Sequence, residues 1–428
     1  MTHPVQLSAE EAARSESGTH RHAAKQGRLF LPSLILGWFG ITLALLTAGS
    51  VAIPKVLAFF REPTKDNDLA LITGIGGIVV MVITPLFGRL SDRTSSRWGI
   101  RKPWLAVGTA VGFIGVLGLA FTTSLWMIVA FWCLAQIGFG ATNMVVHALL
   151  ADQIPTRIRG RVAAATGVST GIATITGAAI VAALPNDQQW SWFIVPGMIG
   201  SLLCLTLLFA LKDIRLQEPP EPMNWRVILS SYWLNPVIYR DFAWAWLCRM
   251  LVTMSIVSVS IFLLFFIIDQ LGIPREVASG VQAQALLYFF VGNVVMAIVC
   301  GWLSDRLGRR KPFVILACLV TAAGLILAMT TRDMNIFMIA ILIVGSGQGA
   351  YISVDVALMT EVLPNFDNAG KDLGIVALSY QLPQVLVPLT AVPILAIGGG
   401  DNYGALFGFA TILAVLGGLS VIPIKKVR

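Results

Sequence analysis

Twelve predominantly apolar runs follow one another between residues 29 and 424, and each is long enough to cross a lipid bilayer. A helix needs about 20 such residues to span roughly 30 Å of hydrocarbon. The runs therefore predict an all-α integral membrane protein with twelve transmembrane helices. Charged residues make up 12% of the chain, about half their usual share in soluble domains, which argues against a soluble enzyme or a disordered protein. The predicted spans are residues 29–57, 69–90, 103–123, 124–150, 162–184, 191–211, 242–269, 278–303, 312–331, 335–361, 373–397 and 403–424.

The basic residues predict the orientation of these spans. Of the thirty Lys and Arg residues, 24 lie in segments on the side of the amino terminus, five lie on the other side, and Arg249 lies within a span. Because basic residues collect in cytosolic loops, both termini are expected in the cytosol and the protein in the plasma or inner membrane. The net charge of +8 is spread over these loops, so it does not indicate a nucleic-acid partner.

The chain divides into two equal parts. Residues 29–211 and 242–424 are each 183 residues long, and each part holds six spans. We therefore predict two six-helix halves that are related by pseudo-symmetry. Around them we expect a disordered cytosolic tail (1–28), a linker with an interfacial helix (212–241) and a short cytosolic tail (425–428).

Two local matches support an internal duplication. The segment Gly88–Arg93 parallels Gly301–Arg306 at an offset of 213 residues, and 138–155 parallels 347–364 at an offset of 209. Each match falls at the same span number of its half. Parallel repeats of this kind are typical of secondary transporters.

One loop motif resembles that of the major facilitator superfamily. The family's loop after the second span of each half reads G-x-L-[AS]-D-[RK]-x-G-R-[RK], and residues 301–310 (GWLSDRLGRR) match it throughout. The first copy, SDRTSSRWGIRKPW at 91–104, is similar to the loop of the glycoside–pentoside–hexuronide:cation symporters and of sucrose-transporter-like members. The resemblance implies the major facilitator fold, alternating access and no enzymatic activity.

The same resemblance implies a gate at the cytosolic side. In the family the motif aspartate contacts neighbouring helices and helps to close this gate, so we expect gating roles for Asp92 and Asp305 and a topological role for most arginines. Two acid–base pairs, Asp152 with Arg161 and Glu361 with Lys371, look like matching contacts across loops. The expected gating set is Gly88, Asp92, Arg93, Arg101, Asp152, Arg161, Gly301, Asp305, Arg306, Arg309, Glu361 and Lys371.

Three ionisable residues within spans are candidates for proton coupling. Such groups are costly in a bilayer and are functional candidates for that reason. Arg249 and Asp355 lie at similar depths from the cytosolic side of the second half, so they could form a proton-responsive pair, a static bridge, or, through Arg249, a site for an anionic substrate. A histidine has a reference pKa near 6.5, so His147 could titrate in the working range, although a hydrogen-bonded structural histidine is the simpler interpretation.

Polar side chains in the expected cavity-lining spans suggest the substrate. Amides supply the donors and acceptors that hydroxyl groups need, and an aromatic ring can stack on an apolar face. The set favours a neutral, sugar-like molecule. Its members are Trp38, Gln136, Asn143, Asn293, Gln348, Tyr351, Gln381 and Gln384.

These patterns predict a monomeric, proton-coupled importer of a sugar or glycoside, with no metal or cofactor. The second span has no aspartate beyond Leu69, which disfavours the sodium coupling of the glycoside–pentoside–hexuronide family. An exporter of drugs or metabolites is the alternative, although the fifth span lacks the G-x-x-x-G-P-x-x-G-G motif of drug antiporters. A non-transporting membrane sensor is a more distant alternative.

Overall fold

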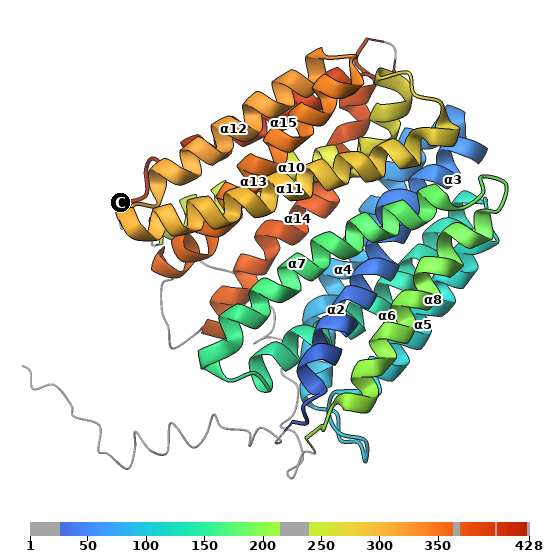
Figure 1. Ribbon diagram of the computed structural model, residues 1–428, viewed down its shortest axis with the longest axis vertical. Helices are drawn as coiled ribbons and strands as arrows, with labels where there is room; N and C mark the ends of the chain where they lie inside the picture. The colour runs from blue at the N-terminus through green and yellow to red at the C-terminus, as the bar shows by residue number, and fades with distance from the viewer. Residues whose placement is uncertain (1–25, 215–238, 363–368, 399, 426–428) are drawn as a thin grey trace, which may run out of the picture.

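The computed structural model describes residues 26–214, 239–362, 369–398 and 400–425 of the chain (Figure 1). Every regular element in these ranges is a helix. The elements of the first half are α2 (Phe30–Thr47), η1 (Ala48–Ala52), α3 (Ile53–Phe60), η2 (Glu62–Thr64), α4 (Lys65–Asp92), α5 (Lys102–Ala120), α6 (Leu125–Asp152), α7 (Thr156–Ala183) and α8 (Gln189–Ala210).

The second half repeats this order. Its elements are α10 (Arg240–Phe265), η3 (Phe266–Gln270), α11 (Arg275–Leu307), α12 (Lys311–Thr330), α13 (Met334–Val362), α14 (Ala369–Leu395) and α15 (Tyr403–Leu419). The π-helical turns η1 and η3 continue the first span of each half without a break.

The predicted membrane fold is confirmed. Within the described ranges, eleven helices are long and apolar enough to cross a membrane, and α15 adds a shorter apolar helix of 17 residues. The expected interfacial helix of the linker and the amino-terminal tail lie outside the described residues, apart from short stretches at their edges.

Glycines allow the third and fourth helices of each half to approach closely. A Cβ atom on Gly138 of α6 would collide with the backbone of Gly112 on α5, and one on Gly347 of α13 would collide with Thr321 on α12. Gly138 and Gly112 lie 209 residues before Gly347 and Thr321, respectively. The two halves therefore share the same internal packing, as the sequence repeat implies.

Two seams join the halves, one between α4 and α14 and one between α7 and α11. In the first, Gly77 faces the backbone carbonyl of Gln384, and in the second, the ring of Phe290 lies directly against Gly171. Residues 77 and 290, and likewise 171 and 384, are 213 positions apart. The seams are thus equivalent by pseudo-symmetry. The glycine and the larger residue have exchanged places between them.

The bundle has two ends, which we call inner and outer after the orientation predicted from the sequence. The inner end carries the α4–α5 and α11–α12 loops, and the outer end carries the α3–α4 connection and the start of α15. In Figure 1 the two halves meet at the outer end, and their axes diverge toward the inner end.

Candidate transport site

An ion pair between two helices of the second half lies at the centre of the candidate site. Arg249 on α10 and Asp355 on α13 approach to 3.3 Å between Nε and Oδ2, and their side chains are 20% and 6% exposed. The hydroxyl of Tyr351, one helical turn before Asp355, donates to Oδ1 of the carboxylate at 2.8 Å. The structure thus brings together two of the sequence-predicted coupling residues and one cavity residue.

The guanidinium group of Arg249 is not fully enclosed. Its central carbon lies 5.5 Å from the ring centre of Tyr380 on α14, and Tyr380 is 45% exposed. An arginine has five N–H donors in a planar group, so Arg249 keeps donors for a ligand while it binds Asp355. Tyr380 was not among the sequence-predicted residues, although its place next to Gln381 on the eleventh span could have suggested it.

The corresponding region of the first half holds His147 and Trp38. The two rings, from α6 and α2, meet edge to face with their centres 4.4 Å apart. The indole Nε1 of Trp38 donates to the hydroxyl of Thr170 on α7 at 2.9 Å, which fixes the ring between three helices. His147 is exposed, and its side chain has no carboxylate partner among the described residues.

A polar stripe runs along α6 on the side of His147. Gln136, Gly140, Asn143 and His147 recur at spacings of four, three and four residues, which places them on one face of the helix. A Cβ atom on Gly140 would meet no atom within 4 Å, so this face borders open space. The amides of Gln136 and Asn143 are half-buried beside that space.

The second half contributes four further amides. Gln384 on α14 is exposed, whereas Asn293 on α11, Gln348 on α13 and Gln381 on α14 are half-buried. Within the described part of the chain no hydrogen bond involves the side chain of any of these amides, and Oε1 of Gln348 is buried without a partner. Within the described ranges, the donors and acceptors of these four amides are thus not taken up by protein partners.

At the inner end each half holds an arginine that binds the end of its own fourth helix. Arg101 is 4% exposed and donates to Ser91 Oγ at 2.8 Å and to Asp152 Oδ2 at 2.7 Å. The expected pairing of Asp152 with Arg161 is wrong, because Arg101 occupies this carboxylate and Arg161 is exposed.

The second half repeats the arrangement in a looser form. Arg310 donates to Ser304 Oγ at 2.9 Å and to Asp305 Oδ1 at 2.7 Å, and its Nε lies 3.6 Å from Glu361 Oε1. Arg310 is thus a partner of Glu361. The expected pairing of Glu361 with Lys371 falls on a side chain that lies outside the described part of the chain.

The other gating residues take varied positions. Arg306 lies over the ring of Trp302, with 5.3 Å from its central guanidinium carbon to the ring centre, and Arg309 is exposed. A Cβ atom added to Gly88 would meet Met144, and one added to Gly301 would meet Ser353, at ordinary van der Waals distances. The side chain of Asp92 lies outside the described part, and Arg93 makes contacts of its own.

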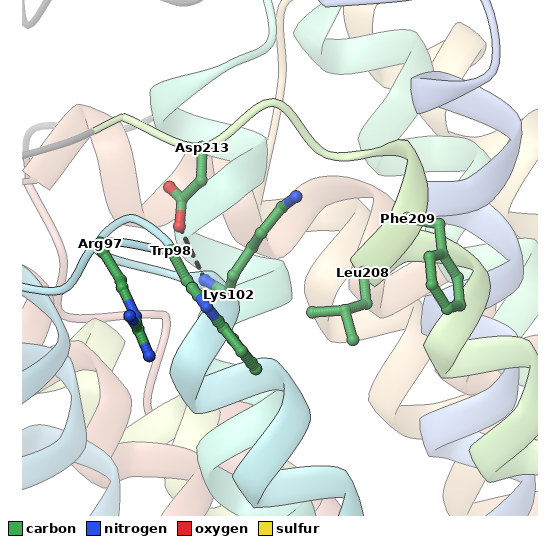
Figure 2. A pocket seen from close by; sticks show the side chains of 6 residues that line it. All are labelled: Arg97, Trp98, Lys102, Leu208, Phe209 and Asp213. Carbon is green, nitrogen blue, oxygen red and sulfur yellow. Dashed lines mark hydrogen bonds between the residues drawn. The ribbon is translucent and has the colours of Figure 1, made fainter.

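The loop of the first copy is anchored by the end of α8. Asp213 Oδ2 accepts hydrogen bonds from the backbone N–H groups of Arg101 and Lys102, at 2.6 and 2.7 Å, and so caps α5. Gly99 makes this approach possible, because its φ of +110° and the closeness of Asp213 exclude a side chain. Figure 2 shows Asp213 and Lys102 in the surface pocket beside this contact, with Trp98 nearby.

The outer end holds a cluster of charged residues and a tyrosine that was not predicted from the sequence. Lys65, the first residue of α4, binds Asp269 of η3 at 2.8 Å. The hydroxyl of Tyr403, the first residue of α15, lies 2.9 Å from a carboxylate oxygen of Asp66 and 2.9 Å from one of Asp269. These bonds join the first half to the second.

Further contacts reinforce the closure of the outer end. Arg275 of α11 lies 3.6 Å from Glu62 of η2. Asn186, after α7, donates to the carbonyl of Glu276, and Gln282 of α11 donates to the carbonyl of Ser50 in η1. The outer end is therefore closed in this structure.

The fold and the site define a class of protein, a membrane transporter with polar groups between two pseudo-symmetric halves. A sequence profile of the Major Facilitator Superfamily matches residues 37–288 and 246–427. The chain belongs to this superfamily.

Individual relatives are distant. The probable metabolite transport protein CsbC of Bacillus subtilis is 24% identical over 413 residues, which cover 84% of this chain and 86% of the relative. The gentisate transporter of Corynebacterium glutamicum is 23% identical over 413 residues, with 90% and 86% covered. A crystal structure of a D-xylose-proton symporter superposes with a TM-score of 0.68 at 18% identity and covers 94% of this chain and 98% of its own, which shows the shared fold.

Proposed function

We propose that the protein is a proton-coupled importer of a small polar metabolite, with a sugar or glycoside as the favoured substrate, and that Arg249 and Asp355 couple proton and substrate movement. The observation that carries the proposal is their ion pair, in which the carboxylate of Asp355 is buried and Arg249 lies over the partly exposed ring of Tyr380. An ion pair inside a membrane protein is expensive to maintain. The partial exposure of Arg249 and Tyr380 favours a role in transport over a purely structural one.

The pair suggests how coupling works. While Asp355 is ionised, it binds Arg249 and Tyr351. If Asp355 takes up a proton, its attraction to Arg249 falls, and the guanidinium group can turn to a substrate or to other partners. Proton binding at Asp355 and substrate binding near Arg249 are then linked. With the orientation predicted from the sequence, the closed outer end corresponds to the inward-facing state.

The amides support a neutral polyol as the substrate. Gln136 and Asn143 from the first half, and Gln348, Gln381 and Gln384 from the second, all lack side-chain partners within the described ranges. Each amide offers two donors and an acceptor, so the set can bind several hydroxyl groups. The similarity of residues 91–104 to sugar symporters of the glycoside–pentoside–hexuronide family agrees with this choice.

A second substrate class, an organic acid with an aromatic or unsaturated ring, is favoured by Arg249 and Tyr380. A planar guanidinium group binds a carboxylate with two parallel hydrogen bonds, and Tyr380 offers a partly exposed ring beside it. The relative named gentisate transporter carries such a substrate by its name.

Uptake into proteoliposomes tests both classes. The purified protein would be given a panel of radiolabelled sugars, glycosides and aromatic acids, with an inward proton gradient or none. Uptake of a sugar that rises with the gradient supports the proposal, and gradient-driven uptake of an acid alone moves it to the second class. Proton-driven efflux would establish an exporter, and the absence of any transport across the panel would contradict the proposal in favour of a sensor.

A further inference from the structure

The outer cluster links three helices of opposite halves through one buried hydroxyl group. Tyr403 is fully buried and Lys65 is 5% exposed. Lys65 and Asp66 start α4 in the first half, whereas Asp269 and Tyr403 belong to the second half. Any opening of the outer end must separate these groups.

The geometry of the cluster needs more protons than its hydroxyl supplies. Tyr403 Oη lies 2.9 Å from Oδ1 of Asp66 and 2.9 Å from Oδ2 of Asp269. Each of these distances between two oxygen atoms is a hydrogen bond only when a proton lies between them. A tyrosine hydroxyl donates one proton, and ionised carboxylates only accept. Two separate hydrogen bonds therefore require that one of the two carboxyl groups carries the second proton.

The surrounding charges assign that proton to Asp66. The ammonium group of Lys65 lies 2.8 Å from both oxygens of Asp269, which stabilises the ionised form of Asp269. Burial of Asp66 and the nearby carboxylate of Asp401 disfavour its ionised form, whereas Tyr403 and Lys65 favour it. Asp66 also shares the hydroxyl of Tyr403 with the carboxylate of Asp269, so a second negative charge at this hydroxyl is unfavourable.

We propose that Asp66 is a proton-binding site of the outer gate, and that the outer end closes only when Asp66 is protonated. In the closed state, the carboxylic acid of Asp66 donates to the oxygen of Tyr403, and the hydroxyl of Tyr403 donates to the carboxylate of Asp269. When the gate opens, water replaces Tyr403, and Asp66 releases its proton to the outer solution. The inference rests on the proposed function only for alternating access, and it does not depend on the substrate or on Asp355.

The sign of the pH effect follows. Acid on the outer side keeps Asp66 protonated and favours the closed outer end, whereas alkali favours the open one. Because one proton is linked to closure, the open-to-closed ratio should rise up to about tenfold per pH unit across the titration.

The distance between two spin labels across the outer end, measured by pulsed electron paramagnetic resonance in nanodiscs without substrate, tests the inference. Phe121, after α5, and Thr330, at the end of α12, are exposed at the outer end of opposite halves, and they are equivalent positions, 209 residues apart. We expect one short distance at acid pH in the double variant Phe121→Cys, Thr330→Cys and growth of a longer one as pH rises.

Two variants and a matched control decide the result. Asp66→Asn keeps a neutral donor for Tyr403, so the short distance should persist at every pH. Tyr403→Phe removes the bridging hydroxyl, so the long distance should dominate at every pH. Asp68→Asn is the control, because Asp68 lies on the same turn of α4 but binds Arg61 within the same half at 2.6 Å, and it should titrate like the parent.

The proposal is overturned if the parent distance does not change with pH, or if Asp66→Asn titrates like the parent. Proton-driven uptake is measured separately on the same variants. If Asp66→Asn loses the pH dependence of the gate but keeps coupled uptake, the gate is confirmed and coupling belongs to another residue. If the parent takes up substrate with protons although its gate does not respond to pH, only the present inference is contradicted.

Discussion

The two ends of the bundle use ion pairs in opposite ways. At the outer end, Lys65 binds Asp269 across the boundary between the halves. At the inner end, Arg101 binds Asp152 and Arg310 binds Glu361, and each pair stays within its own half. Bonds within a half survive when the halves move, whereas bonds between halves must break. The comparison teaches that the inner arginines hold each half together and that the outer cluster holds one conformational state.

The largest effect is expected from the loss of Arg101. In Arg101→Gln, the carboxylate of Asp152 and the hydroxyl of Ser91 lose a nearly buried partner, which should lower the free energy of unfolding by about 3–5 kcal/mol. Arg310→Gln removes a more exposed partner and should cost only about 1 kcal/mol. Thermal unfolding of the purified variants in detergent measures both, and equal losses would show that the two inner networks do not differ as described.

A smaller effect, on conformation, is expected from Lys65→Gln. It removes a charge-assisted bond between the halves, worth about 1.5–3 kcal/mol, so the outer end should open more often while each half stays folded. The substitution Gly74→Cys places a thiol within the α4–α14 seam. In the Lys65→Gln background, a thiol reagent should modify this cysteine on the order of tenfold faster than in the parent. An unchanged rate, with unchanged unfolding, would mean that this pair does not hold the gate.

Gly171 tests whether the α7–α11 seam is as tight as it looks. In Gly171→Ala, the added methyl group would collide with the ring of Phe290, and overpacking should cost about 1–3 kcal/mol. The matched control is Gly167→Ala, one turn earlier on α7 and facing open space. Helix propensity alone should make it neutral or slightly stabilising, by up to about 1 kcal/mol. Similar stabilities for the two variants would contradict the seam.

The smallest effect on stability is expected from Asp305→Asn, because the side chain of Asp305 is 73% exposed. Insertion and unfolding should stay at parent values, since the positive charge of the loop is kept. If the motif aspartates gate the inner end, transport should still fall in Asp305→Asn, and it should also fall in Asp92→Asn. Parent transport rates in both variants would leave these aspartates without a gating role.

Much of the fold follows from the sequence. Hydrophobic runs and basic loops were enough for twelve spans, because a bilayer allows few other solutions. The repeat offset of 213 also holds at the seams, where it relates Gly77 to Phe290 and Gly171 to Gln384. Matched depth in two spans was enough to put Arg249 and Asp355 forward as partners, and the structure places them 3.3 Å apart.

Other contacts could not be predicted, for definite physical reasons. Arg161 is nearer to Asp152 in sequence, but Asp213 caps α5 and fixes Arg101 against the end of α6. Lys65 looked like a loop residue because the apolar run starts at Leu69. The helix α4 begins four residues earlier, and its polar first turn faces the other half.

The position of Lys55 was also not predicted. It is one of the five basic residues counted on the outer side, yet its side chain is 1% exposed. Its Nζ lies 3.3 Å from the carbonyl oxygen of Val181 and 4.3 Å from the ring centre of Trp192. A long side chain can place its charge far from the position that its residue number suggests.

The central claim is that Arg249 and Asp355 couple protons to transport, and one pair of assays on the double variant Arg249→Gln, Asp355→Asn tests it most directly. Arg249→Gln leaves the buried carboxylate of Asp355 without its partner, at about 3–5 kcal/mol. Asp355→Asn leaves a half-buried guanidinium group and should cost less, and the double variant should fold. Accumulation under an imposed pH gradient is compared with substrate counterflow without one. We expect counterflow without accumulation, because the titrating carboxylate is gone. Full accumulation by the double variant would contradict it and would reduce the pair to a structural bridge.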